Sequence, residues 1–302
     1  MHDRRKGIAL AFAAACISGF SVFLNSFAVR EFGDATLYTT AKNLVAAAIL
    51  LGIGVSLTAA RSPLGLALPR TPREQLGLLV VGVVGGGIAF ALFFQGLAQT
   101  SSTSAAFIQK TLVIWVALLA IAFLRERFTL LHVAAIALLV GGQAVASGSL
   151  GPLALDRGGA MVLVATLLWS VEIVIVKSLL SRLSPLTVAL GRLGIGVVVL
   201  AVIAVAGGAT TQLGSVTPQA WLWVTLTGII LSAYVATWYF ALRHAGAIDV
   251  TAVLVFGAVI TAALSAGVRG TSVTPTALGL ALITFGCVLI VTFGAERRSA
   301  LA

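Results

Sequence analysis

The sequence predicts an all-α polytopic membrane protein in which ten transmembrane helices form two inverted five-helix repeats. The composition, a series of long apolar stretches and an internal repeat support this fold class. Of the 302 residues, 60% are hydrophobic and only 9% are charged, and the mean hydropathy is +1.12. Soluble domains average roughly 45–50% apolar and about 25% charged residues. This chain has too few polar side chains to cover a water-facing surface, which excludes a soluble enzyme, a disordered chain and, despite the net charge of +10, a nucleic-acid-binding domain.

The apolar stretches have the length of membrane spans. Each holds about 18–25 residues, enough for a helix to cross about 30 Å of hydrocarbon. The stretches are continuous and do not alternate with polar residues, and a chain in lipid must satisfy its backbone hydrogen bonds internally, so helices are expected. The stretches cover residues 7–29, 35–57, 75–98, 103–123, 130–147, 158–180, 186–206, 220–242, 248–268 and 276–293.

Several spans begin with a hydroxyl residue followed by proline, a sequence typical of a capped helix start. The pairs are Thr71-Pro72, Ser184-Pro185, Thr217-Pro218 and Thr274-Pro275. Because no proline falls inside a span, bending within the membrane is expected at glycine, either at residues 85–87 or at residues 191–196.

The distribution of Lys and Arg predicts the orientation. Cytoplasmic loops carry an excess of these residues. With the N-terminus inside, thirteen of them fall in inner segments and three in outer segments, so both termini are predicted to be cytoplasmic. The inner set is Arg4, Arg5, Lys6, Arg61, Arg70, Arg73, Arg125, Arg127, Lys177, Arg182, Arg243, Arg297 and Arg298, and the outer set is Arg30, Arg157 and Arg269.

The two halves of the chain resemble each other. At an offset of about 150 residues the intramembrane cation Lys42 aligns with Arg192, and at about 145 Gly141 aligns with Gly286. We expect a first five-helix repeat at residues 1–150 and a second at 151–302. Five is an odd number of spans, so the second repeat must be inverted, as in secondary transporters that work by alternating access around a site near the midplane.

Short motifs resemble those of the drug/metabolite transporter superfamily, in particular its EamA-type members. The stretch Leu124–Thr129 follows the fourth span, a basic residue lies early in the second helix of each half, and Leu168-Trp169-Ser170 is similar to the family's tryptophan motif. Residues 270–274 lack the corresponding glutamate, and Gly19-Phe20 stands where tryptophan is expected. The chain most resembles YddG-type amino-acid exporters of bacterial inner membranes, and amino acids as cargo are implied by this resemblance alone.

Two lysines deep in the spans predict a cationic cavity. Lys110 lies about 12 Å from the outer end of its span at about 1.5 Å per residue, and Lys42 lies at a similar depth with Asn43 and Asn25. No acid at that depth neutralises the lysines, and a charge there is costly unless it faces a cavity or a partner. These residues, with Gln109, are therefore candidates to bind a substrate carboxylate. Alternatively, each lysine bonds helix carbonyl groups or extends along a groove towards the surface.

Glu172 and Arg192 are expected about 10 Å from the inner surface at about 1.5 Å per residue. They form either an ion pair that stabilises a helix hairpin or an inner gate, while proton binding by Glu172 is a further hypothesis. Trp169 lies one turn from Glu172 on the same helix face, and we expect it to wall the cavity. Tyr234 and Trp238 are further candidates for the wall, and helix packing is the alternative for all three aromatic residues.

The sequence predicts a secondary transporter and not an enzyme. It has neither a nucleotide-binding loop of the GxxxxGK[ST] type nor an HExxH or GxSxG motif. Cys16 and Cys287 form no metal motif, so no cofactor or metal is expected. The predicted function is export of small amino acids or related metabolites, including aromatic ones, across the bacterial inner membrane by alternating access. The expected partners are this cargo and membrane lipid, with no nucleic acid. An exporter of another cargo, such as a drug or nucleobase, and a passive facilitator or channel remain alternatives, and the oligomeric state stays open.

Overall fold

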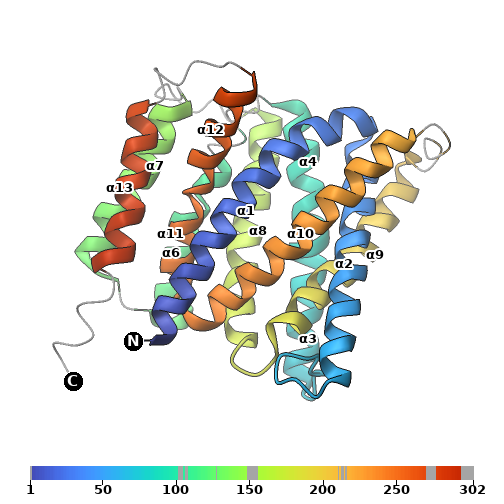
Figure 1. Ribbon diagram of the computed structural model, residues 1–302, viewed down its shortest axis with the longest axis horizontal. Helices are drawn as coiled ribbons and strands as arrows, with labels where there is room; N and C mark the ends of the chain where they lie inside the picture. The colour runs from blue at the N-terminus through green and yellow to red at the C-terminus, as the bar shows by residue number, and fades with distance from the viewer. Residues whose placement is uncertain are drawn as a thin grey trace.

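The computed structural model is all-helical over the residues that it describes, which are 2–100, 105, 108–126, 128–147, 156–209, 211, 214, 216–269 and 277–293 (Figure 1). In these parts of the chain, 7 helices are long and apolar enough to cross a membrane, and the shorter apolar helices Ile108–Leu124, Leu130–Gly142 and Ala281–Ile290 lie in the other three predicted stretches. The predicted ten-span helical fold is therefore confirmed. We call the end of the bundle where α1 begins the base, which is at the bottom of Figure 1, and the opposite end the top.

The helices of the first half follow the predicted stretches closely. They are α1 (His2–Phe32), α2 (Ala35–Ala59), α3 (Pro72–Val80), η1 (Val81–Ile88), α4 (Ala89–Gln99), α6 (Leu112–Leu124) and α7 (Leu130–Ser147). Those of the second half are α8 (Arg157–Leu179), α9 (Pro185–Ala206), α10 (Pro218–His244), α11 (Ala247–Leu254), α12 (Gly257–Arg269) and α13 (Ala277–Phe293).

Three of the predicted helix starts are capped as expected. The hydroxyl groups of Thr71, Ser184 and Thr217 accept hydrogen bonds from backbone N–H groups in the first turns of α3, α9 and α10, and a proline follows each cap. The fourth predicted cap, Thr274, lies outside the described residues.

The third span changes its winding in the middle. Its segments α3, η1 and α4 follow one another directly, and η1 is a π-helix that contains Gly85 and Gly86. A Cβ atom on Gly86 would overlap the backbone oxygen of Arg192, so the absence of a side chain lets η1 lie directly against α9. The predicted use of glycine for distortion is confirmed in this span.

The fourth and ninth spans are interrupted as well. A turn at Thr111 precedes α6, and a turn at Val255 and Phe256 separates α11 from α12. The Thr111 hydroxyl donates to the carbonyl oxygen of Ile108 at 2.6 Å, which competes with regular helical hydrogen bonding. The expectation that bending would be confined to glycine is therefore wrong for the fourth span. Positions 111 and 256 correspond at the offset of 145, so the two halves break their fourth helices at equivalent places.

Contacts between the halves follow a pseudo-twofold relation. The fifth helices of the two halves, α7 and α13, pack side by side (Figure 1), and so do the second helices, α2 and α9. The contact of α1 with α10 has its counterpart in that of α8 with α4, and the contact of α2 with α10 has its counterpart in that of α9 with η1. Each half therefore contacts the other half through equivalent helices, as two inverted copies of one bundle would.

Candidate functional site

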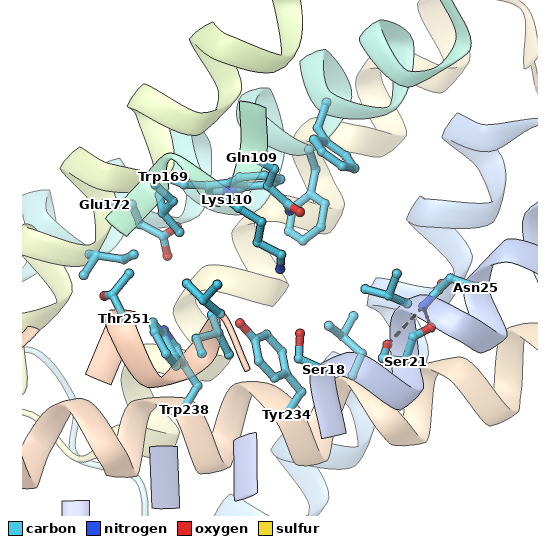
Figure 2. Close-up of a pocket in the computed structure, with 18 of the residues that line it drawn as sticks. Ser18, Ser21, Asn25, Gln109, Lys110, Trp169, Glu172, Tyr234, Trp238 and Thr251 are labelled. Carbon is cyan, nitrogen blue, oxygen red and sulfur yellow. Dashed lines mark hydrogen bonds between the residues drawn. The ribbon is translucent and has the colours of Figure 1, made fainter. Parts of the chain in front are cut away.

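A cavity of about 600 Å³ lies between the two halves (Figure 2). α1 contributes one face to the cavity, because the α1 residues that line it follow the i, i+3, i+4, i+7 spacing of one side of a helix. Nine of the ten residues predicted for the site line this cavity. They are Lys110, Trp169, Lys42, Asn25, Gln109, Tyr234, Trp238, Glu172 and Arg192.

Lys110 extends into the middle of the cavity (Figure 2). It immediately precedes the turn at Thr111, whose hydroxyl donates to Ile108 and accepts a hydrogen bond from the Trp115 indole at 3.1 Å. This turn ends the regular helix just after Lys110. Within the described part of the chain, the ammonium group of Lys110 has no hydrogen bond, ion pair or ring contact.

Lys42 is held by neutral groups. Its Nζ donates to Asn25 Oδ1 at 3.1 Å and lies 4.9 Å from the ring centroid of Tyr38 and 5.5 Å from that of Phe94. The Tyr38 hydroxyl donates to the same Asn25 oxygen at 2.5 Å, and the Asn25 amide nitrogen donates to the Ser21 carbonyl at 2.7 Å. Asn25 thus positions Lys42, whose charge meets no carboxylate among the residues described.

Glu172 and Arg192 form a buried ion pair in the cavity wall. Arg192 Nε lies 2.6 Å from Glu172 Oε1, and an η-nitrogen of Arg192 donates to Oε2 at 3.2 Å. The Tyr239 hydroxyl also donates to Oε1, at 2.8 Å. A Cβ atom on Gly85 would overlap this carboxylate, so the glycine of η1 makes the space that the pair occupies. Both carboxylate oxygens of Glu172 are therefore engaged by groups of the protein itself.

Aromatic side chains form much of the remaining wall. Trp169 packs against Phe90 and Phe93 with ring centroids 5.4 and 5.3 Å apart, and its indole N–H donates to the Gly85 carbonyl at 3.1 Å. On the opposite side Tyr234 and Trp238 stack, with centroids 6.3 Å apart. Phe90 and Phe93 were not predicted to form this wall, although their apolar spacing along α4 was a usable signal.

Asn43 does not line the cavity, so the expectation that it contributes there is not met. Successive residues on a helix point about 100° apart, and the face that carries Lys42 turns the next side chain away. Asn43 is fully buried, and its two amide atoms have no hydrogen-bond partner in the described structure. Thr251, which was not predicted, does line the cavity (Figure 2). It is 2% exposed, and its hydroxyl also lacks a partner among these residues.

Charged side chains link several helices at the base of the bundle. Asp249, in the first turn of α11, pairs with Arg4 of α1 at 2.9 Å and with His132 of α7 at 3.2 Å. Glu126 accepts hydrogen bonds from the backbone N–H groups of Ala247 and Ile248, at 2.7 and 3.2 Å. A carboxylate from the first half thus caps the start of α11 in the second half, where no side chain of its own does so.

The turn between α10 and α11 is held from its other side too. Lys177 of α8 donates to the carbonyl oxygens of Leu242 and Ala245, the last of these at 2.6 Å. A Cβ atom on Gly7 would overlap Ala245, so α1 approaches this turn closely. These contacts join α1, α8, α10 and α11 at the base, below the cavity.

Comparison with known proteins identifies the family. The model of the EamA-like transporter family matches residues 5–148 and again residues 156–292. No curated protein matches the chain. One solved structure, described as a crystal structure of a protein, superposes with a TM-score of 0.75 at 20% sequence identity, covering 97% of this chain and 99% of the other. This likeness supports the fold, and the two family matches cover most of the sequence. The chain therefore belongs to the EamA-like transporter family and is a multi-pass membrane transporter, not an enzyme.

Proposed function

We propose that the protein is a secondary transporter that exports small amino acids and related carboxylate metabolites, including aromatic ones, by alternating access. Lys110 carries this proposal, because its ammonium group extends into the cavity without a partner among the described residues. A cation in a low-dielectric cavity is strongly stabilised by an anionic ligand. The carboxylate of the cargo is the group that would supply the missing counter-charge.

The size and the wall of the cavity support a small, partly apolar cargo. Ligand pockets usually enclose about 300–1,000 Å³, and this cavity of about 600 Å³ falls within that range. Trp169, Tyr234 and Trp238 offer flat apolar surfaces for a side chain such as that of phenylalanine. Gln109 and Ser18 add neutral hydrogen-bonding groups.

Alternating access is supported by the repeat and by the interrupted spans. Inverted repeats with a site at their interface, formed by discontinuous helices, are the architecture that exchanges two opposite openings. The charged contacts at the base would keep that end closed while cargo exchanges at the top. The excess of Lys and Arg in the segments at the base supports a cytoplasmic base in the bacterial inner membrane.

Transport into proteoliposomes tests this proposal. The wild type should take up labelled phenylalanine or leucine with saturation, and unlabelled amino acid on the far side should accelerate uptake. Lys110→Ala should reduce the rate at least tenfold, whereas Lys6→Ala, a change at an exposed lysine, should not. Uptake by Lys110→Ala at the wild-type rate would contradict the role of Lys110, and uptake without saturation or trans-acceleration would identify a channel or facilitator.

A further inference from the structure

The charges that face the cavity are unbalanced. Among the described lining residues, Lys42, Lys110 and Arg192 carry positive charge, and Glu172 alone carries negative charge. The neighbours of the two lysines are neutral: Asn25, Tyr38 and Phe94 surround Lys42, and Lys110 contacts no acid within the described structure. The binding site therefore presents an excess of two positive charges to whatever enters it.

Glu172 cannot serve as the acceptor for a positively charged ligand group. Its Oε1 is held by Arg192 and Tyr239 and its Oε2 by Arg192. Redirecting it to a ligand would leave the Arg192 guanidinium buried without a counter-charge, which is strongly unfavourable. An ammonium group in the cavity would find only neutral oxygens and aromatic faces, and it would lie near two unneutralised lysines.

In contrast to a charged acceptor, the cavity does offer several hydrogen-bond donors to a ligand. Lys110 has three N–H groups without a partner in the described structure, and Lys42 uses one of its three at Asn25. The Thr251 hydroxyl is 2% exposed, lines the cavity and has no partner among the described residues. A carboxylate accepts several hydrogen bonds and donates none, so it complements both the charge and the donors of this site.

We propose that the cavity selects an organic acid, a carboxylate on an apolar or aromatic body without an ammonium group, over the corresponding amino acid. This inference rests on the proposed function and narrows its cargo to net anions. The carboxylate would bind Lys110 and Lys42, and the body would lie against Trp169 and the Tyr234–Trp238 stack. The amino group of an amino acid would add a charge that the cavity repels.

Three ligands that share one aromatic body test this selection. Phenylpropionate carries the carboxylate alone, phenylalanine adds the amino group, and phenethylamine carries the amine alone. Isothermal titration of the purified protein in detergent should give a dissociation constant at least tenfold lower for phenylpropionate than for phenylalanine, with phenethylamine weakest. Leucine and its amine-free counterpart 4-methylpentanoate should repeat this order for an aliphatic body.

Variants assign the preference to the lysines. Lys110→Met keeps most of the length of the side chain and removes the charge, so it should weaken phenylpropionate binding at least tenfold and leave phenethylamine binding unchanged or stronger. Lys6→Ala should change neither. Binding of phenylalanine equal to or tighter than that of phenylpropionate would overturn this inference and leave the proposed function standing. Failure of all five ligands to bind, together with no amino-acid uptake in proteoliposomes, would refute the proposed function as well.

Discussion

The ion pair between Glu172 and Arg192 allows the sharpest test of how the cavity wall is stabilised. The two residues are 3% and 9% exposed, and they share two short contacts of 2.6 and 3.2 Å. In Glu172→Gln, the guanidinium would lose its counter-charge and keep only neutral partners, namely the new amide oxygen, the Gly85 carbonyl at 3.5 Å and the face of Phe90 at 5.2 Å. Removing one partner of a buried pair costs about 3–5 kcal/mol, so we expect this loss in the free energy of unfolding.

The double variant Glu172→Gln with Arg192→Met should recover most of that loss, because it leaves no unpaired buried charge. Thermal unfolding in detergent measures both effects. At about 2 °C per kcal/mol for a protein of this size, each single variant should unfold about 6–10 °C below the wild type and the double variant within a few degrees of it. The coupling energy follows from the wild type, the two single variants and the double variant. A value below about 0.5 kcal/mol would show that the pair does not stabilise the wall.

Three further variants probe packing, capping and burial. Gly85→Ala should destabilise the protein by about 1–3 kcal/mol, because its Cβ would overlap the carboxylate of the buried pair; Gly52→Ala on α2, where a Cβ meets nothing within 4 Å, is the matched control and should not destabilise. Glu126→Gln removes a charged cap worth about 1 kcal/mol, so hydrogen–deuterium exchange in the first turn of α11 should accelerate about fivefold, and unchanged exchange would contradict the cap. Asn43→Leu should raise the free energy of unfolding by about 1–3 kcal/mol, because it replaces a buried amide without hydrogen bonds, and a loss of stability would indicate that the amide has a partner.

The fold was predictable because hydrocarbon imposes a strong constraint on sequence. A helix that crosses the membrane needs a long apolar run, and every described helix falls in one of the ten predicted stretches or extends it by a few residues, as α1 and α10 do. The interruptions at Thr111 and at Val255 were not predicted. Threonine is common inside membrane helices, and whether its hydroxyl bends one depends on its rotamer and on the side chains packed against it.

The depth of the site residues in the membrane was more predictable than the side of the helix on which each residue lies. Counting residues along a span gives the depth of a lysine, and Lys42 and Lys110 do lie at the cavity. It does not give the rotation of the helix about its axis, which is why Asn43 was expected at the cavity and lies outside it. The contact of Glu126 with α11 was equally hidden, since it joins residues 121 positions apart along the chain.

The duplication explains how the cavity acquired its excess positive charge. At the offset of 150, Lys42 corresponds to Arg192, and Glu172 corresponds to Val22; all four residues line the cavity. The second half thus supplies a cation together with its acid, whereas the first half keeps the cation and has valine in place of the acid. At the offset of 145, Lys110 corresponds to Val255, which also lines the cavity. The acid of the second half neutralises the cation of that half. The two ammonium groups left for a ligand to neutralise therefore come from two departures from equivalence, valine in place of an acid at position 22 and lysine at position 110 where the second half has valine.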